Sequence, residues 1–362
     1  MTTPLLAIIK DEIQTHDFMR LDRFMELALS HPEHGYYMSW RSFGLEGDFI
    51  TAPEISQMFG ELIGLWAFDQ IQQQNLTQAG LFEMGPGRGT LMADGLRAIT
   101  PFLQAQSPEA HMPIHMPIHM LEISPALKQQ QIAALKPNPI THHSTLGNLP
   151  PIPLIFIANE FFDALPIRQL VKHDDAWHER IVTIRDDELC LSTMPSDDPP
   201  AGEQQWDDAP SGQIYETAPQ LPAVIDQISQ HIRQYGGAAL IIDYGKANPL
   251  GDSVQAVRDH KPVDILETPG KADVSAWVDF NAIKTSASNS KVFGPTNQGD
   301  FLKALGLYQR AEQSSAAADP KTRRMIAAAV DRLSSPAQMG RVFQVMAIVP
   351  PEHNAGVAGF PS

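Results

Sequence analysis

The chain of 362 residues has one cysteine, few basic residues for its size and no long hydrophobic run. A lone Cys190 excludes an internal disulfide and a metal site built from several thiolates. Lys and Arg number 26 against 42 Asp and Glu, and the formal net charge of -16 argues against a nucleic-acid partner, which needs a basic surface. Because no apolar stretch approaches membrane-spanning length and residues 1–12 lack a signal-peptide pattern, the sequence predicts a cytoplasmic protein without membrane insertion.

Residues 81–90, Leu-Phe-Glu-Met-Gly-Pro-Gly-Arg-Gly-Thr, form the most informative stretch. They predict a buried strand that ends near an acid, a glycine-rich turn and the start of a helix. The glycines lack a Cβ, so their backbone can approach a small ligand closely. These glycines are Gly85, Gly87 and Gly89. The alternative is a strand-turn-helix corner that only packs tightly.

The spacing of this turn favours one ligand over another. A dinucleotide fingerprint would have its third glycine at position 90, where Thr90 stands. The pattern acid-x-Gly-x-Gly-x-Gly, which begins at Glu83, is typical of S-adenosylmethionine (SAM) methyltransferases. In that role Glu83 would face the positive amino acid end of the cofactor.

From residue 81 onward, short apolar runs alternate with helical segments. This alternation predicts an α/β fold with a mostly parallel, doubly wound sheet covered on both faces. The run Arg341 to Val349 predicts an antiparallel last strand. Four acids close the earlier runs: Glu83, Glu122, Glu160 and Asp243. Ligands of such sheets bind at the carboxyl ends of the strands, so these acids mark the expected site.

The segments around this core predict additional structure. Leu5 to Phe18 and Leu21 to Ser30 are expected to be helices, and Thr51 with Glu54 predicts a capping box at the head of a long helix. The expected divisions are an N-terminal helical region with a turn over the cofactor (1–78), a core (79–165, 236–250 and 341–350), a β-meander with a helix (166–235), a second and mostly helical insertion (251–340) and a disordered tail (351–362).

Residues 111–120 repeat the tetrapeptide His-Met-Pro-Ile. Three histidines at a period of four would line one face of a helix, but Pro113 and Pro117 forbid that helix. A tandem duplication that lengthens a loop explains the repeat better, and no metal site is expected.

Glu122 closes the second predicted strand, about 35 residues after the glycine turn, against a usual gap of about 20. A carboxylate at this place can accept hydrogen bonds from both hydroxyls of a ribose. The alternative is an acid at the N-terminus of the helix that begins at Pro125. Because ribose belongs to NAD as well as to SAM, Glu122 does not separate the two cofactors.

The motif Asn159-Glu160-Phe161-Phe162-Asp163-Ala164-Leu165-Pro166 follows the third apolar run. If the chain turns helically there, Glu160 and Asp163 lie on one side and face the same cavity. Two carboxylates beside a methyl donor suit a guanidinium, whose planar fork of donors they can hold and orient for in-line attack. The alternative is a pair of acids at a helix start, stabilised by the helix dipole.

Taken together, these motifs resemble those of the MidA family of methyltransferases, over almost the whole chain. The matching stretches share their order along the chain, and they are residues 31–37 (HPEHGYY), 47–60, 83–90, 122–127, 159–166, 243–245 (DYG), 251–256, 278–280 (VDF), 296–299 and 343–347. The resemblance implies a Rossmann-like class I SAM-dependent methyltransferase fold, with an N-terminal helical region and α/β insertions. It further implies a protein arginine as methyl acceptor, with symmetric dimethylation of a respiratory complex I subunit in mitochondrial relatives.

The resemblance also implies roles for individual residues. Thr51, Pro53 and Glu54 are expected to form a wall of the cofactor site, and Asn159 to act with Glu160 and Asp163 in catalysis. The residues expected on the substrate side are Asp243, Tyr244, Asp279 and Trp277. The chain departs from the family pattern at three positions: Lys246, Trp277 and Gln344. Trp277 stands where the family tends to have histidine, so the acceptor pocket of this chain is expected to differ.

Three other functions fit parts of this pattern. A SAM-binding assembly factor would bind the cofactor without turnover, and a small-molecule N-methyltransferase would have a narrower acceptor cavity. An NAD-linked oxidoreductase is disfavoured by Thr90.

Overall fold

The computed structural model describes residues 3–38, 51–105, 116–197 and 209–361. The chain forms two compact units, each assembled from separate segments. The first comprises Met1–Phe49, Asp163–Leu221 and Ala247–Asp279, and the second comprises Ile50–Phe162, Pro222–Lys246 and Phe280–Ser362. No helix among the described residues is both long and apolar enough to cross a bilayer.

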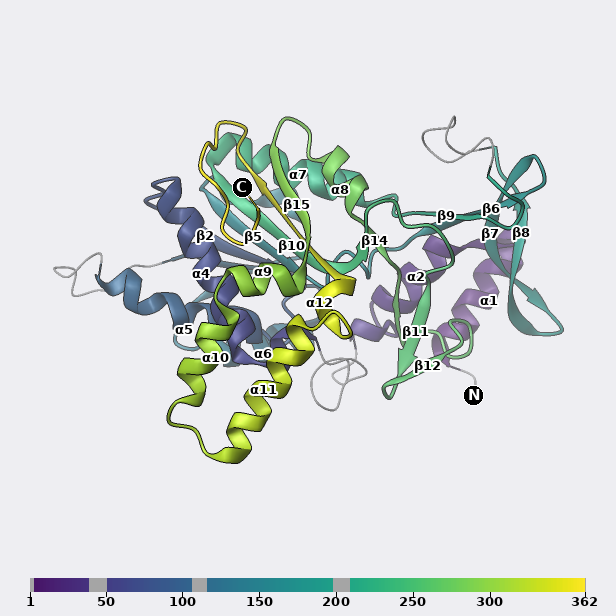
Figure 1. The fold of residues 1–362 in the computed structure, drawn as a ribbon. Coiled ribbons are helices and arrows are strands. Elements are labelled where there is room, and N and C mark those ends of the chain that lie inside the picture. The colour runs from purple at the N-terminus through teal and green to yellow at the C-terminus, as the bar shows by residue number, and fades with distance from the viewer. Residues whose placement is uncertain (1–2, 39–50, 106–115, 198–208, 362) are drawn as a thin grey trace. The chain divides into compact units, whose positions relative to one another are not determined.

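The second unit is built on one sheet in the order β15-β16-β10-β5-β2-β3-β4 (Figure 1). Its strands are β2 (Gly80–Met84), β3 (Ile118–Leu121), β4 (Ile140–His143), β5 (Leu154–Asn159), β10 (Gly237–Lys246), β15 (Lys291–Asn297) and β16 (Phe343–Val349). The pairs from β10 to β4 are parallel, and β16 is antiparallel to both β10 and β15. The predicted α/β class is confirmed, and the antiparallel strand predicted for residues 341–349 is β16, which begins at Phe343 because residues 339–342 form α12.

The strand register brings the chemistry to one edge of this sheet. Met84 lies opposite Ala158 and Leu121, and Ile242 lies opposite Asn159. The residues that follow these positions therefore emerge together at the carboxyl ends of four neighbouring strands. Glu122, Glu160 and Asp243 each come directly after such a position, and Glu83 lies one residue before the end of its strand.

The second unit also contains helices, which pack on its sheet or on one another. They are α3 (Ala52–Ile55), α4 (Gln57–Gln73), α5 (Thr90–Ala105), α6 (Pro125–Ala134), α7 (Leu221–Tyr235), α8 (Phe280–Ser286), α9 (Gln298–Ala304), α10 (Leu307–Ser315), α11 (Pro320–Ser334) and α12 (Met339–Val342). Phe59, Ile63 and Trp66 of α4 are fully or almost fully buried, as their helical period predicts. A Cβ on Gly64 would lie 2.5 Å from the Cα of Gly95, so glycine lets α4 and α5 pack backbone against backbone.

Two strands of this sheet were not predicted. β4, Ile-Thr-His-His, is short and mostly polar, so it lacks the apolar run by which buried strands are found. β15 contains Gly294 and Pro295, and its register against β16 shifts between Phe293 and Thr296. Because Gly and Pro interrupt it, the segment resembles a loop in sequence. β15 also lies in the expected helical insertion, and β16 is an inner strand beside it.

The C-terminal segment is ordered, and the prediction of a disordered tail is wrong. Val357 is buried, and the Phe360 ring lies 5.4 Å from the Phe301 ring. Polar and glycine-rich residues separate these apolar side chains in the sequence, so no apolar period marks them.

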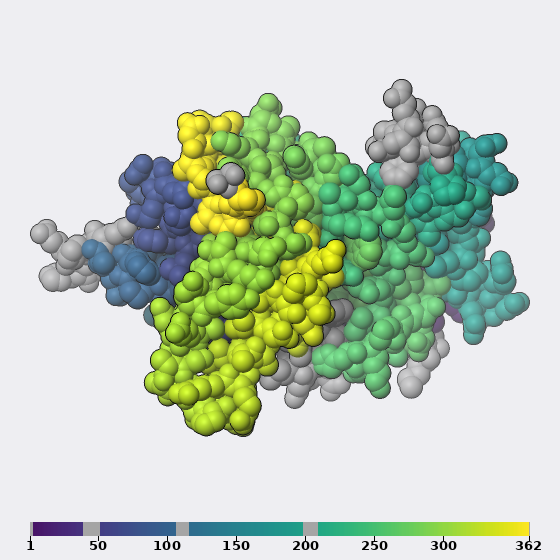
Figure 2. All heavy atoms as spheres, viewed as in Figure 1, coloured from purple at the N-terminus to yellow at the C-terminus, as the bar shows by residue number. Residues whose placement is uncertain are grey.

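Arg310 of α10 pairs with the buried Glu61 of α4 at 2.7 Å. Atoms of α10 and α11, yellow-green in Figure 2, form part of the surface of this unit.

The described part of the first unit contains the α-helices α1 and α2 and an antiparallel sheet. α1 (Pro4–His16) and α2 (Leu21–Ser30) confirm the two predicted helices, and Leu5, Ile9 and Phe24 pack with Val182 of the sheet. Its strands are β1 (Met19–Arg20), β6 (Arg168–His173), β7 (Ala176–Arg185), β8 (Glu188–Pro195) and β9 (Ile214–Thr217).

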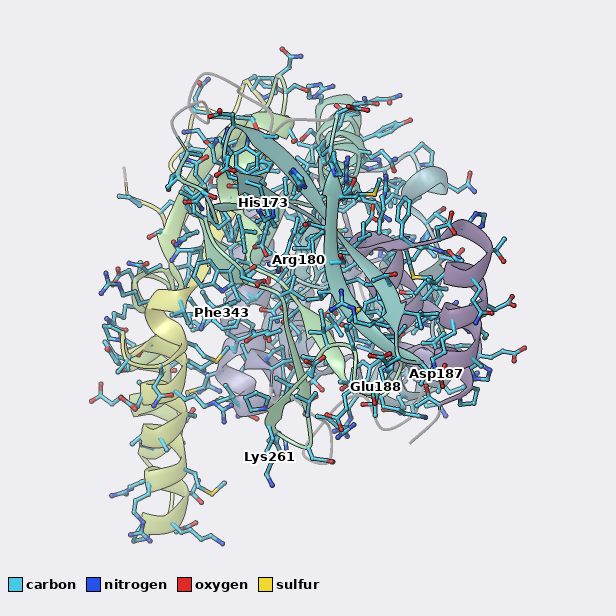
Figure 3. All side chains as sticks on the ribbon, turned by 90° about the vertical axis from the view of Figure 1, so that its right-hand side faces the viewer. His173, Arg180, Asp187, Glu188, Lys261 and Phe343 are labelled. Atoms are coloured by element: carbon cyan, nitrogen blue, oxygen red, sulfur yellow. The ribbon has the colours of Figure 1, made fainter. Side chains whose placement is uncertain are left out.

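The β-meander predicted after residue 166 is confirmed. β7 pairs antiparallel with β6 and with β8. Figure 3 shows Asp187 and Glu188 at the turn between β7 and β8, and His173 at the other end of the meander. Asp174, Asp186 and Asp187 have positive φ, which the short polar side chain of Asp tolerates in tight turns.

A three-stranded sheet completes the first unit, in the order β12-β11-β13. Its strands are β11 (Gln255–Arg258), β12 (Lys261–Val263) and β13 (Asp273–Ser275), and β14 (Val278–Asp279) follows them. Parts of the segments expected as an N-terminal region, a first insertion and a second insertion therefore share one compact unit, and their remainders belong to the other. Local periodicity finds such elements but carries no information about which of them share a core.

Candidate functional site

The glycine turn between β2 and α5 has the geometry of a close-approach site. Gly85, Gly87 and Gly89 have φ of 62°, 51° and 83°, a region that favours glycine. A Cβ on Gly85 would also lie 3.0 Å from the Phe161 ring. The turn therefore needs glycine at these positions, and it lies at the carboxyl edge of the sheet, where Gly85 is exposed.

Glu83 is a buried acid next to this turn. Its side chain is 3% exposed, and burial raises the pKa of its carboxyl to about 8, although a backbone hydrogen bond from Met92 opposes the shift. Among the described residues its Oε2 has no hydrogen-bond partner. A buried carboxyl with an unmatched oxygen is costly unless a donor or a cation completes it. An ammonium group would do so.

Glu122 lies directly after β3 and is 7% exposed. Its Oε1 accepts from the backbone N–H of Ser124 at 2.7 Å, and its Oε2 accepts from Gln131 at 3.1 Å. Ser124, not Glu122, caps helix α6. A carboxylate oxygen has two lone pairs, so each oxygen of Glu122 can accept a further hydrogen bond.

The α3 segment is linked to the glycine turn by Glu54, a residue that was predicted to take part in a capping box. Thr51 is its N-cap residue but makes no side-chain capping bond, and the long helix α4 begins separately, capped by Ser56. Glu54 instead accepts from the Thr90 hydroxyl at 2.7 Å. The predicted capping box is therefore wrong, because the side chain that it required reaches the glycine turn. Pro53 lies within α3, and residues 47–50 lie outside the described residues.

Glu160 belongs to the motif of residues 159–166, here called the acceptor motif, and has a strained backbone conformation with φ of 52°. Its Oε1 accepts from the backbone N–H of Ala52 at 2.9 Å and from Asn159 Nδ2 at 3.0 Å. The Oδ1 of Asn159 is buried without a partner among the described residues. Positive φ at a non-glycine residue marks a backbone that its surroundings hold in place, often at functional sites.

The helical turn expected after β5 is absent. Residues 160–165 form bends and turns, and the two units of the chain divide between Phe162 and Asp163. Helical spacing therefore cannot relate Glu160 to Asp163, as the sequence analysis assumed. Positive φ at Glu160 turns the chain out of both strand and helix.

Asp243 accepts hydrogen bonds from the backbone of the acceptor motif. It is fully buried; its Oδ2 accepts from the backbone N–H groups of Phe161 and Phe162 at 3.1 and 2.8 Å, and its Oδ1 accepts from that of Tyr244 at 2.8 Å. The Tyr244 ring contacts the Phe343 ring. Sequence reasoning placed Asp243 on the substrate side, and its expected contact with substrate stays a prediction.

The remaining expected site residues lie in the first unit. The carbonyl of Asp163 accepts from the Ala276 N–H at 2.9 Å, and Asp279 Oδ1 accepts from the Asn248 N–H at 2.9 Å. The backbone N–H of Trp277 donates to Ser253 Oγ at 2.8 Å. These bonds fix the backbone that carries the expected side chains.

Tyr37 of the HPEHGYY motif adds to this group. Its hydroxyl donates to Asp273 Oδ1 at 3.0 Å. Burial, Asp273 and Asp163 together raise the pKa of Tyr37 well above its usual value. The tyrosine is therefore a neutral donor among carboxylates, and the spacing of Tyr37 from Asp163 in the chain gave no sign of this.

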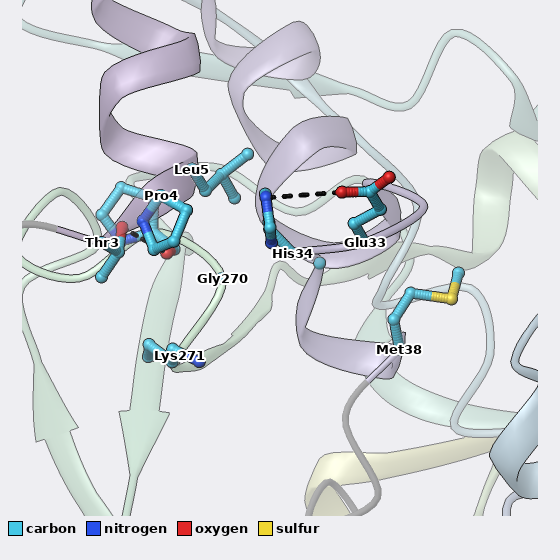
Figure 4. Close-up of a pocket in the computed structure, with 10 residues that line it drawn as sticks. Thr3, Pro4, Leu5, Glu33, His34, Met38, Gly270 and Lys271 are labelled. Carbon is cyan, nitrogen blue, oxygen red and sulfur yellow. Dashed lines mark hydrogen bonds and ion pairs between the residues drawn. The ribbon is translucent and has the colours of Figure 1, made fainter.

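The HPEHGYY motif also lines a small cavity of about 100 Å³ within the first unit (Figure 4). The Nε2 of His34 lies 3.8 Å from Oε2 of Glu33. The volume is below the roughly 300 Å³ at which small-molecule pockets usually begin. None of the residues expected to bind a cofactor lines it.

Among residues 3–38, 51–105, 116–197 and 209–361, no group of three or more His, Cys, Asp or Glu residues is placed to bind a metal ion. Of the His-Met-Pro-Ile repeat, His111 and His115 lie outside the described ranges. His119 of β3 hydrogen-bonds His143 at 3.0 Å, and burial lowers its pKa to about 4.

The second unit fits SAM. The unmatched Oε2 of Glu83 suits the ammonium of the amino acid moiety, the glycine turn admits backbone approach, and Glu122 can accept from ribose hydroxyls. Bound SAM supplies a methyl group on a positively charged sulfur, which makes that methyl electrophilic.

Comparison with known proteins agrees with this chemistry. Residues 62–296 match the profile of a family described as S-adenosyl-L-methionine-dependent methyltransferase. The protein arginine methyltransferase NDUFAF7, mitochondrial, of Danio rerio is 33% identical over 90% of this chain and 82% of its own length. The Homo sapiens protein of the same name is 31% identical over 98% of this chain and 85% of its own length.

A solved structure extends the comparison to the bound ligand. A protein from Burkholderia thailandensis, crystallised with S-adenosyl-homocysteine, superposes with a TM-score of 0.83 at 25% identity, over 99% of this chain and 96% of its own. A second crystal structure from the same organism, at 24% identity and a TM-score of 0.81, shows the same fold.

The curated relatives contradict one prediction. They are mitochondrial proteins by name, so the prediction of a cytoplasmic protein is wrong. It depended on the absence of a recognised targeting pattern, and such an absence does not specify a compartment. On the motif, the fold and the relatives together, the chain belongs to the family of SAM-dependent methyltransferases, and SAM is its cofactor.

Proposed function

We propose that this methyltransferase acts on arginine in a protein. The observation that carries the proposal is its identity of 31–33%, over 90% or more of its length, to proteins named protein arginine methyltransferase. The local chemistry supports it. A carboxylate held at the carboxyl edge of the sheet, within the unit that carries the glycine turn, suits a guanidinium better than a neutral acceptor.

The cofactor residues have separate tasks in this proposal. Glu83 pairs with the ammonium group, Glu122 accepts from the ribose, and the glycines admit the backbone between them. Glu54, through Thr90, holds the α3 segment against the glycine turn, with Thr51 and Pro53 as part of the wall. Each task needs only binding and orientation, which these side chains provide.

Glu160 and Asn159 orient the acceptor nitrogen. Two donors fix Oε1 of Glu160, so the carboxylate direction is set before substrate arrives. Preorganisation of this kind lowers the entropy cost of aligning a nitrogen lone pair with the methyl group. Asp163 is proposed as the second carboxylate, and one proton leaves the guanidinium after methyl transfer.

The residues on the substrate side follow from the same proposal. Tyr244, Asp279 and Trp277 contact the acceptor protein, and Asp243 supports the acceptor motif from within the core. The target is a subunit of respiratory complex I that becomes symmetrically dimethylated. The resemblance to the MidA family supports that target.

A transfer assay with radiolabelled SAM tests the proposal. Paired peptides that differ only in arginine or lysine are offered to the wild type, and hydrolysates are analysed for monomethylated and symmetrically dimethylated arginine. We expect transfer to arginine only. Glu160→Gln is expected to lower the rate about 100-fold by loss of alignment, and Glu188→Gln, at an exposed meander turn, to leave it unchanged.

Three results would replace the proposal. Transfer to lysine at an equal rate would remove the arginine assignment. SAM binding without transfer to any peptide or to complex I subunits would favour an assembly factor. Transfer only to free amines would favour a small-molecule enzyme.

A further inference from the structure

Gln131 of α6, in the second unit, has a fully buried polar side chain. Its Nε2 donates to the carbonyl of Gly87 at 2.7 Å and to Glu122 Oε2 at 3.1 Å. Its Oε1 lies 2.7 Å from His142 Nε2 on β4. The Gln131 amide therefore links three places: the glycine turn, Glu122 directly after β3, and the outer strand β4.

The partners of this amide fix its orientation. Carbonyl and carboxylate oxygens only accept hydrogen bonds, so the two N–H groups of Gln131 must point at Gly87 and Glu122. Oε1 then accepts, which requires that His142 Nε2 carries a hydrogen. His142 thus holds the amide in the one orientation that serves both acceptors.

The backbone confirms how closely α6 approaches the turn. A Cβ on Gly89 would lie 3.5 Å from the Cα of Gln131, an ordinary contact distance. A side chain at position 89 would therefore touch the backbone of α6. Loss of the Gln131 amide would leave the partly buried carbonyl of Gly87 and the buried carboxylate of Glu122 without this donor.

We infer that Gln131, oriented by His142, is a positioning residue that fixes the Glu122 carboxylate relative to the glycine turn. It determines which lone pairs of Glu122 are directed at the two ribose hydroxyls. The inference rests on the proposed ribose contact of Glu122. The alternative is that Gln131 only completes the hydrogen bonds of a buried core.

A comparison of two ligands separates these roles. Binding of S-adenosylhomocysteine and of its 2′,3′-dideoxy analogue is measured by calorimetry for the wild type, for Gln131→Leu and for the matched control Gln129→Leu, which is exposed on the same helix. We expect Gln131→Leu to weaken S-adenosylhomocysteine about tenfold or more, from loss of hydrogen bonds to a charged group. Binding of the dideoxy analogue is expected to change less than about twofold, and the control to match the wild type.

A second pair of variants tests the role of His142. His142→Gln keeps a donor near the place of Nε2 and is expected to bind S-adenosylhomocysteine like the wild type, whereas His142→Leu is expected to weaken it. In the transfer assay these losses are expected in the KM for SAM, with kcat little changed. This pair carries the test if Gln131→Leu does not fold.

Equal weakening of both ligands by Gln131→Leu, or no weakening of S-adenosylhomocysteine, would overturn the inference. Wild-type binding of S-adenosylhomocysteine that is no tighter than that of the dideoxy analogue would instead remove the ribose contact. Failure of the arginine assay alone would leave this test intact, because its readout is cofactor binding.

Discussion

Glu54 accepts a hydrogen bond of 2.7 Å from the hydroxyl of Thr90 and thereby joins the α3 segment to the glycine turn. Arg88 Nη1 lies 3.6 Å from the other oxygen of Glu54 and reinforces the link. Thr90 occupies the position where a dinucleotide fingerprint has glycine, and glycine could not make this bond. Thr90, whose presence in place of glycine favoured SAM over NAD, therefore also links the glycine turn to α3.

Replacing Thr90 by Val tests this link, because Val keeps the shape and removes the hydroxyl. We expect S-adenosylhomocysteine to bind about threefold to tenfold more weakly, since loss of a bond to a charged acceptor releases the α3 segment. Titration calorimetry measures the change. Thr90→Ser, which keeps the hydroxyl, is expected to bind within about twofold of the wild type, and equal losses in Ser and Val variants would contradict the prediction.

The buried carboxyl of Glu83 predicts a pH dependence of stability without cofactor. Its folded pKa of about 8 exceeds its ordinary value of 4.5, so between these values the folded chain holds a proton that the unfolded chain has released. The contribution of Glu83 to the free energy of unfolding is fully present below about pH 4.5 and declines as the pH rises towards 8. Glu83→Gln cannot titrate, so this decline is expected to disappear.

Urea unfolding at pH 5.5 and at pH 8.5 measures this effect. The free energy of unfolding of the wild type, relative to that of Glu83→Gln, is expected to fall between the two pH values. Other groups titrate in both proteins and cancel in the difference. A difference that stays constant or rises with pH would show that Glu83 is not buried as described.

The same carboxyl predicts proton release on cofactor binding. An ammonium beside Glu83 favours the ionised acid, so binding below pH 8 expels the proton that the free protein holds. Calorimetry of S-adenosylhomocysteine at pH 7 in buffers with different ionisation enthalpies counts that proton. The wild type is expected to release close to one proton more than Glu83→Gln, and equal counts would remove Glu83 from the ammonium site.

The sequence predicted those parts of the fold that depend on local pattern. Apolar runs located β2, β5 and β10, and the acids at their ends located the site edge, because both features lie within a few residues of each other. β4 and β15 were missed since one is polar and the other is interrupted by Gly294 and Pro295. Long-range contacts override local propensity at such strands.

The candidate site likewise has some residues that could be predicted from the sequence and others that could not. Glu83 and the glycines could be predicted because the turn that they form is continuous in sequence. Gln131 and Tyr37 could not, since their partners Gly87 and Asp273 lie 44 and 236 residues away. A buried glutamine in an amphipathic helix has no sequence signal that separates it from an exposed one such as Gln129.

Asp243 is expected to stabilise the acceptor motif, and Asp243→Asn tests this. The amide would turn an N–H toward backbone N–H groups of Phe161, Phe162 or Tyr244, which need an acceptor. We expect the free energy of unfolding to fall by about 2 kcal/mol and arginine methylation to fall with it. Urea unfolding and the transfer assay measure both, with the exposed Asp197→Asn as control. Unchanged stability would mean that these bonds are not maintained.

The C-terminal segment is expected to contribute to the core of the second unit through Phe360. Its ring contacts those of Phe301 and Phe293, and Gly359, with φ of 87°, brings it there because a Cβ at that place would lie 2.3 Å from the Phe301 ring. Phe360→Ala removes a half-buried ring and is expected to lower the free energy of unfolding by about 1–3 kcal/mol, less than a fully buried phenylalanine would cost. Asn354→Ala, exposed in the same segment, is expected to change it by less than about 0.5 kcal/mol. Equal free energies of unfolding of the two variants in urea would instead support the disordered tail that was predicted from the sequence.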